Sequence, residues 1–187
     1  MKIEYSYISD SFFKQEYAIS MMQEYTEMFL YALVAFLLPF ILGHEQLIVG
    51  SVVNCTLVLA ALNLRGARLL PVILLPSIGA LLAGMIFGPL SSSLVYMLPF
   101  IWLGNAILVL AVKEIALRGK RNHLVTLGAG ALAKTALLSL SAFLLFSFGL
   151  VPLQFIAAFG ILQLATALCG GVAALGVQEA KIRLAVA

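Results

Sequence analysis

The chain has 187 residues, of which 63% are hydrophobic and 10% are charged, and its mean hydropathy is +1.11. Soluble globular proteins contain roughly 25% charged residues, so this composition excludes a soluble domain and indicates an integral membrane protein. The formal net charge is only +3, and the basic residues lie in short loops rather than in one patch, which argues against a nucleic-acid partner.

The first 26 residues form a separate N-terminal segment in which acidic, basic and tyrosine residues are mixed. A cleavable signal peptide needs a basic start followed by a short apolar run, and this segment has neither. We expect residues 1–26 to be cytoplasmic or to lie at the membrane interface. A short surface helix over about residues 10–25 and a disordered tail are both compatible with the pattern.

Six apolar segments follow, and they predict six transmembrane helices, because about 20 apolar helical residues cross roughly 30 Å of hydrocarbon. The segments are 27–43, 46–64, 69–88, 91–113, 124–148 and 152–177. Short breaks with turn residues separate them, so consecutive helices should run antiparallel. We therefore predict an all-α membrane protein, with one six-helix domain over residues 27–180 and a cytoplasmic tail over residues 181–187.

Basic residues indicate which side of the membrane each loop occupies. Those near the loops after the second and fourth spans and in the C-terminal tail are Arg65, Arg68, Lys113, Arg118, Lys120, Arg121, Lys181 and Arg183. The loops after the first, third and fifth spans contain no lysine or arginine. Because short basic loops stay in the cytoplasm, both termini are predicted to be cytoplasmic.

One charged residue lies deep inside a span. Lys134 is near the middle of segment 124–148, where an ammonium costs about 2.5–3.5 kcal/mol on insertion scales. Two interpretations remain open. Lys134 lines a substrate site, or it snorkels or is satisfied by neighbouring helices.

Three amides are expected at similar depths in other spans. At about 1.5 Å per residue, Asn54, Asn105 and Gln163 lie roughly 12, 21 and 16 Å below the outer face. Lys134 lies at about 21 Å on the same scale. Buried amide and ammonium groups need hydrogen-bond partners in lipid. These four side chains could therefore line a polar pocket that opens outward, or form a hydrogen-bond network between helices.

The fourth span contains features that favour a pocket. Pro99 and Gly104 bracket Trp102 just before Asn105, and helix breaks at membrane depth are tolerated where they line a cavity or are buried in protein. Tyr96 and Trp102 could form apolar walls against a flat ligand. The alternative is that Tyr96 belongs to the interfacial aromatic belt and Trp102 packs against lipid.

Small residues recur on one face of the sixth span, at Thr166, Gly170 and Ala174. Such a face lets two helix backbones approach closely in a membrane. Packing within this chain and docking of a second membrane subunit both fit the spacing.

Sequence templates for catalysis are missing. There is no GxSxG, HExxH or Walker lysine loop, and the interiors of the spans contain no acidic residue. Cys55 and Cys169 form no CxxC, Cys/His or haem-attachment pattern, which argues against a metal centre. We therefore predict a protein that is not an enzyme, has no catalytic residues, metal site or cofactor, and binds a solute with energy supplied by other proteins.

The chain resembles the substrate-binding S component of energy-coupling factor (ECF) transporters. The resemblance covers roughly residues 27–180 and depends on the six helices and on the stretches PFIWLGNAILV (99–109) and GALAKTALL (130–138). It implies capture of a vitamin, a vitamin precursor or a metal ion from outside the cell. It also implies a transmembrane coupling subunit and two cytoplasmic ATPases as partners.

Two departures from that family refine the expectation. The first span has Ala32 and Ala35 only three positions apart, instead of the AxxxA with which many members dock the coupling subunit, so we assign no docking residues. No histidine precedes His44, whereas the nickel and cobalt members have one near the mature N-terminus. An organic solute is therefore favoured over a metal ion, and Lys134 would suit an anionic group such as a carboxylate.

The resulting hypothesis is a multi-pass plasma-membrane subunit that binds a small organic solute. The polar contacts would come from Lys134, Asn105, Asn54 and Gln163, and the apolar walls from Trp102 and Tyr96. Two alternatives remain: a small autonomous transporter or channel that works as a homo-oligomer, and a non-transporting anchor or assembly subunit of a larger complex.

Overall fold

The computed structural model describes residues 11–43, 45–87 and 91–186. Over these ranges the chain forms helices joined by short irregular segments, without strands. The α-helices are α2 (Met21–Leu42), α3 (Gln46–Asn63), α4 (Leu69–Phe87), α5 (Ser91–Ala111), α6 (His123–Ser147), α7 (Gln154–Phe159) and α8 (Ile161–Val186). A 3₁₀ turn, η1 (Gly66–Arg68), precedes α4, and a π-helical segment, η2 (Val112–Arg118), continues α5.

Within the described ranges, six helical segments are long and apolar enough to cross a membrane, which confirms the predicted all-α, six-span architecture. The first span begins earlier than predicted, at Met21. The reason is a capping box in which Ser20 Oγ accepts a hydrogen bond from the Gln23 backbone N–H and Gln23 Oε1 accepts one from the Ser20 N–H. This reciprocal pair satisfies two N–H groups at the start of the helix, so α2 begins before the apolar run.

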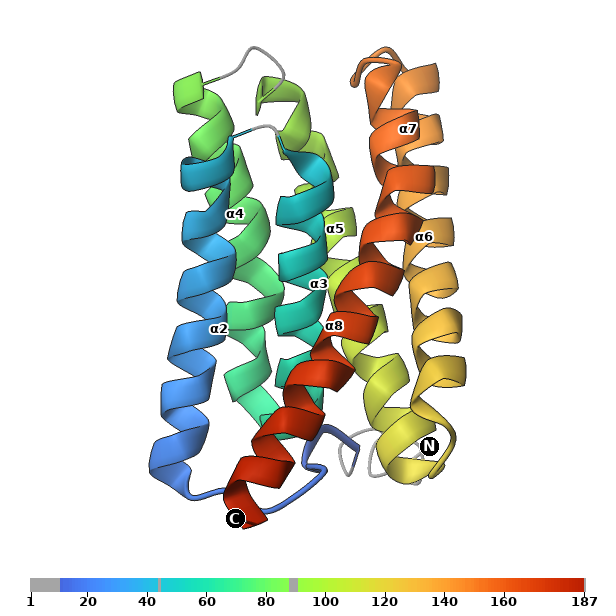
Figure 1. Ribbon diagram of the computed structural model, residues 1–187. Helices are drawn as coiled ribbons and strands as arrows, with labels where there is room; N and C mark the ends of the chain where they lie inside the picture. Colours follow the sequence, from blue (N-terminus) through green and yellow to red (C-terminus); the bar gives the residue numbers. More distant parts are fainter. Residues whose placement is uncertain (1–10, 44, 88–90, 187) are drawn as a thin grey trace.

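The helices form one bundle with two distinct ends (Figure 1). We call the end that contains residues 11–20 and the C-terminal part of α8 the terminal end, and the end that contains Gly43 and residues 148–153 the distal end. In Figure 1, α2 and α4 lie on one side, α6 and α7 on the other, and α3 and α5 between them. From the side of α6, α8 crosses the bundle toward the terminal end and packs extensively against α3.

Small residues allow this close packing of α8 on α3. A Cβ added at Gly170 would lie only 2.2 Å from the Ser51 carbonyl oxygen, so the two backbones touch at this position. Thr166 in turn sits against Gly50, and Ala174 is fully buried in the core. These three small positions of the sixth span therefore pack within the chain, as one of the two sequence interpretations proposed.

An apolar cluster fills the half of the bundle next to the terminal end. Its fully buried members include Leu57, Leu62, Leu64, Leu108 and Val109, which come from α3, from the residue that follows α3, and from α5. In a membrane the lipid is as apolar as these side chains, so dense van der Waals contact is what holds them together. A second, smaller cluster, with Met97, Leu138 and Ala142 among its members, packs α5 against α6 in the distal half.

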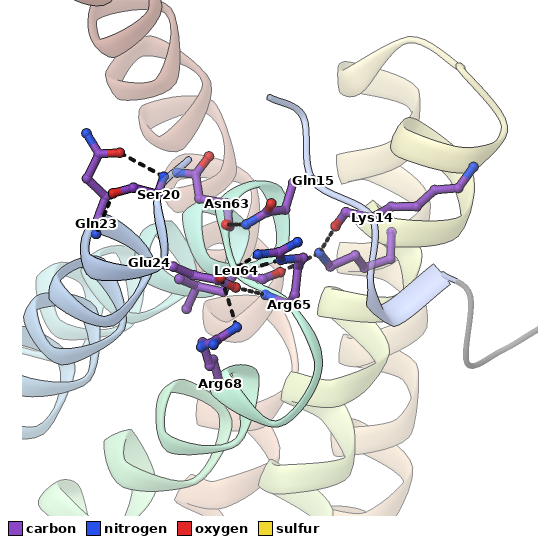
Figure 2. Close-up of polar contacts among 10 residues, drawn as sticks. Lys14, Gln15, Ser20, Gln23, Glu24, Asn63, Leu64, Arg65 and Arg68 are labelled. Carbon is purple, nitrogen blue, oxygen red and sulfur yellow. Dashed lines mark hydrogen bonds and ion pairs between the residues drawn. The ribbon is translucent and has the colours of Figure 1, made fainter. Parts of the chain in front are cut away.

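Residues 11–20, which we call the N-terminal strap, cross the terminal end (Figure 2). The Glu16 backbone N–H donates to the Leu62 carbonyl at 2.9 Å, and the Gln15 side chain donates to the Asn63 carbonyl. These are carbonyls at the C-terminal end of α3, which have no partner inside their own helix. The segment therefore does not form a surface helix over residues 10–25. Residues 13–20 are irregular, and Gln15 and Glu16 donate hydrogen bonds to carbonyls of α3. Residues 1–10 of the predicted N-terminal segment lie outside the described residues.

Two buried charges hold the chain at the terminal end. The Glu24 carboxylate is fully buried and accepts hydrogen bonds from the Arg65 backbone N–H at 2.7 Å and from Arg68 Nη1 at 2.9 Å. The Lys113 ammonium, also fully buried, donates to the Leu64 carbonyl at 2.7 Å and to the Lys14 carbonyl. Glu24 thereby fixes the loop between α3 and α4 (Figure 2). Lys113 ties the strap to the end of α3.

Candidate functional site

A cavity of about 760 Å³ occupies the distal half of the bundle. It extends from Gly43, Gln46 and Gln154 at the distal end down to Asn54, Asn105 and Lys134. Its walls are mostly apolar and include Val53, Ala80, Ile101, Phe155, Phe159 and Leu162. This volume falls within the range of about 300–1,000 Å³ that is typical of small-molecule sites.

Lys134 forms the centre of the cavity floor. Its side chain is only 2% exposed, and its Nζ donates to Asn54 Oδ1 at 2.6 Å and to Asn105 Oδ1 at 2.8 Å. The three residues come from α6, α3 and α5, so one ammonium group joins three helices. Both acceptors are neutral amides, so the hydrogen bonds satisfy the lysine without cancelling its charge.

The amide nitrogen of each asparagine is held by other groups. Asn54 Nδ2 donates to the Gly50 carbonyl at 2.9 Å and to Thr166 Oγ1 at 3.3 Å. Asn105 Nδ2 donates to the Ile73 carbonyl at 2.9 Å. With the nitrogens fixed in this way, both amide oxygens point toward Lys134.

A carbonyl of α4 near Pro76 takes part in the floor of the cavity. Pro76 has no N–H, so it cannot donate to the Val72 carbonyl four residues earlier, and its ring opens the helix at this point. The neighbouring Ile73 carbonyl receives its hydrogen bond from Asn105 instead of relying on the helix alone.

The floor of the cavity is positively charged. Of the described residues that line it, Lys134 is the one cation and none is acidic. The carboxylates of Glu24 and Glu27 lie at the terminal end, in ion pairs with Arg65, Arg68 and Lys181. An ammonium that is surrounded by neutral groups in a medium of low dielectric constant strongly favours an anion beside it.

The break between α7 and α8 brings the fourth predicted amide to the cavity. At Gly160 a Cβ would lie 2.6 Å from the Ile156 carbonyl oxygen, and the helix is interrupted at this residue. Gln163 follows the break and lines the cavity, and Gln46 Nε2 donates to the Ala158 carbonyl at 3.0 Å across it. Interrupted helices at membrane depth are typical of cavities and binding sites.

The structure thus brings Lys134, Asn105, Asn54 and Gln163 together on one cavity. The structure places the two predicted aromatic residues outside the described lining of the cavity. Trp102 does not line the cavity in the described structure, because its Nε1 donates to Ser77 Oγ at 2.8 Å and its ring joins α5 to α4. Tyr96 is 48% exposed, on the far side of α5 from Asn105.

Two other aromatic residues take that place. Phe155 and Phe159 line the cavity from α7, with their ring centroids 5.5 Å apart. The sequence offered a signal for this pair, because residues four apart share a helix face and both precede the break at Gly160. Sequence reasoning also took Lys113 for a loop-flanking cation, although it is fully buried.

In the part of the chain that the structure describes, no three His, Cys, Asp or Glu side chains are grouped so that they could hold a metal ion. Comparison of the chain with protein-family models, with curated proteins and with solved structures finds no match.

Proposed function

We propose that this protein is a membrane-embedded solute-binding subunit that captures a small organic solute from outside the cell. The observation that supports the proposal is the cavity of about 760 Å³ in the distal half, with the buried ammonium of Lys134 at its floor. A buried charge inside a membrane span is costly, and such residues are typically functional. An interhelical network alone would not require a cavity of this size above it.

The distal end is assigned to the outside and the terminal end to the cytoplasm. Arg65, Arg68, Lys120 and Arg121 belong to the loops of the terminal end, whereas the loop over residues 148–153 contains no basic residue. The positive-inside rule therefore supports an outward-facing cavity in the plasma membrane.

Transport is proposed to need partner proteins. The apolar cluster that includes Leu57, Leu62 and Leu108 fills the bundle between the cavity floor and the terminal end. A cavity that ends at a packed core suits a binding subunit, whereas a channel needs a polar path. In keeping with the ECF resemblance, we propose a transmembrane coupling subunit and cytoplasmic ATPases as partners, and a vitamin or vitamin precursor as the class of solute.

Native mass spectrometry of the gently purified full chain tests this function. We expect a discrete small-molecule adduct on the wild type and on Lys120→Ala, an exposed-lysine control, and loss of the adduct from a folded Lys134→Ala variant. A bare protein mass for the wild type, before and after incubation with a small-metabolite extract, would contradict solute capture. Solute uptake into proteoliposomes without any ATPase would favour an autonomous transporter.

A further inference from the structure

Some N–H groups at the cavity floor have no hydrogen-bond acceptor among the described residues. Lys134 has three N–H groups, and the described structure provides acceptors for two of them, on Asn54 and Asn105. Asn54 spends both of its N–H groups on Gly50 and Thr166, whereas Asn105 spends one, on Ile73. One N–H of Lys134 and one N–H of Asn105 therefore remain for a ligand.

Two other polar side chains near the floor, Ser77 and Gln163, also differ in how many of their hydrogen-bonding groups are already paired. Ser77 Oγ donates to the Leu74 carbonyl at 3.0 Å and accepts from Trp102, so its single hydrogen is engaged. The amide of Gln163 lines the cavity and forms no side-chain hydrogen bond with any described residue. The N–H donors left over at the floor, on Lys134, Asn105 and Gln163, call for an acceptor.

The positive charge of Lys134 favours an acceptor that is an anion. Lys134 supplies one positive charge, and the described lining residues supply no negative one. A ligand with a single negative charge would neutralise the site, whereas a cationic or polyanionic ligand would leave a net charge buried. Two adjacent N–H donors match the two oxygens of a carboxylate, and a charge-assisted hydrogen bond is about twice as strong as a neutral one.

The walls determine the rest of the ligand. Above the floor the cavity is lined by Phe155, Phe159, Val53, Ile101 and Leu162, which offer no side-chain hydrogen bonds. A strongly hydrated inorganic anion would lose its water against these walls without replacement. An apolar or aromatic body, in contrast, would gain van der Waals contact and bury surface.

We infer that the cavity binds a small organic monocarboxylate, with its carboxylate at the floor and its apolar body directed toward the distal end. The carboxylate lies between Lys134 Nζ and the amide of Asn105, and Phe155 and Phe159 flank the body. Asn54 is a positioning residue, since it orients Lys134 and has no donor left for the ligand. This inference rests on the proposed solute-binding function and names the chemical class of the solute.

Three probes of equal size separate the charge classes: 4-phenylbutyrate, 4-phenylbutanamide and 4-phenylbutylamine. Their binding is measured as the shift in thermal unfolding of the full chain in lipid nanodiscs, for wild type, Lys134→Met and the exposed-lysine control Lys120→Met. We expect the carboxylate to bind wild type and Lys120→Met about tenfold or more tightly than the amide or the amine. Lys134→Met should lose this preference.

The wild-type comparison needs no variant, so it remains decisive even where Lys134→Met fails to fold. Equal or tighter binding of the amide or the amine would overturn the monocarboxylate inference and leave solute binding intact. Absence of a shift with the carboxylate would also overturn it, as would a native-mass-spectrometry adduct that lacks a carboxyl group. A bare protein mass in the native mass spectrometry would contradict the proposed solute-binding function itself, so the two failures can be told apart.

Discussion

Lys134 on α6 donates a 2.6 Å hydrogen bond to Asn54 on α3, which lies 80 positions earlier in the chain. This contact crosses the floor of the cavity and links two sides of the bundle at the point where packed core gives way to open space. The same lysine therefore supports the fold and faces the cavity. The predictions below separate these two roles.

Replacing Asn54 by aspartate tests the charge of the floor. A carboxylate at position 54 would sit beside Lys134 and neutralise it from within the protein. We expect Asn54→Asp to lower the affinity for 4-phenylbutyrate by at least about tenfold, because the ligand would then add an uncompensated charge. The control is Asn122→Asp, at the exposed N-cap of α6, where an aspartate can accept the same hydrogen bond from the Leu124 N–H. Unchanged affinity in Asn54→Asp, measured by isothermal titration calorimetry, would argue against an anionic ligand.

The placement of Phe155 on the cavity wall, and of Trp102 away from it, gives a second prediction. Phe155→Ala should weaken binding of the same probe, because Phe155 forms part of the cavity wall. Trp102→Phe should leave binding unchanged and lower the stability by about 1 kcal/mol, through loss of the hydrogen bond to Ser77. The reverse pattern of affinities would restore Trp102 as a ligand contact.

Close packing of α8 on α3 predicts a strong response at one glycine. Gly170→Ala should lower the free energy of unfolding by about 1–3 kcal/mol or more, since its Cβ would lie 2.2 Å from the Ser51 carbonyl oxygen. Gly176→Ala, on the same helix with nothing within 4 Å of its Cβ, should be neutral or stabilising by up to about 1 kcal/mol. Denaturation in mixed micelles measures both. Equal stability of the two variants would contradict the packing.

The buried Glu24 should be among the most sensitive polar positions. Glu24→Gln removes the charge that Arg65 and Arg68 share, and we expect a loss of about 1–3 kcal/mol because two partly exposed guanidinium groups lose a charged hydrogen-bond partner. Glu179 also pairs with an arginine, Arg183, but both side chains are exposed. Glu179→Gln should therefore change the stability by less than about 1 kcal/mol. Similar losses in the two variants would show that the Glu24 cluster is weak.

Lys113 is expected to control the N-terminal strap. Lys113→Met removes the hydrogen bonds to the Leu64 and Lys14 carbonyls. Amide hydrogen exchange in residues 11–20 should become faster in this variant than in wild type, whereas Lys120→Met should leave it unchanged. Equal exchange in all three proteins would mean that other contacts hold the strap.

Helix geometry accounts for what the sequence could predict about the site. Depth in the membrane follows from counting residues at about 1.5 Å each, so Lys134, Asn105, Asn54 and Gln163 could be placed near one level before any contact was known. The same geometry also explains why Tyr96 lies away from the cavity. Tyr96 precedes Asn105 by nine residues, and at about 100° per residue it faces the opposite side of the helix, whereas Ile101 faces the same side.

Other features had no signature in the side-chain pattern. The asparagines are oriented by the backbone carbonyls of Gly50 and Ile73, and the strap is held largely by backbone carbonyls at the end of α3. Every residue has such a carbonyl, so only the crossing of the helices decides which ones are reached. The burial of Lys113 could not be predicted for the same reason.

The contacts of α3 with residues far along the chain have a consequence for membrane insertion during synthesis. Asn54 bonds Thr166, which lies 112 positions later, and Asn63 bonds Gln178, which lies 115 positions later. While the chain is being synthesised, α3 enters the membrane with both amides still lacking these partners. Helix α8 is the one that satisfies them, so a chain that stops before α8 would expose polar groups to lipid and become a target for quality control.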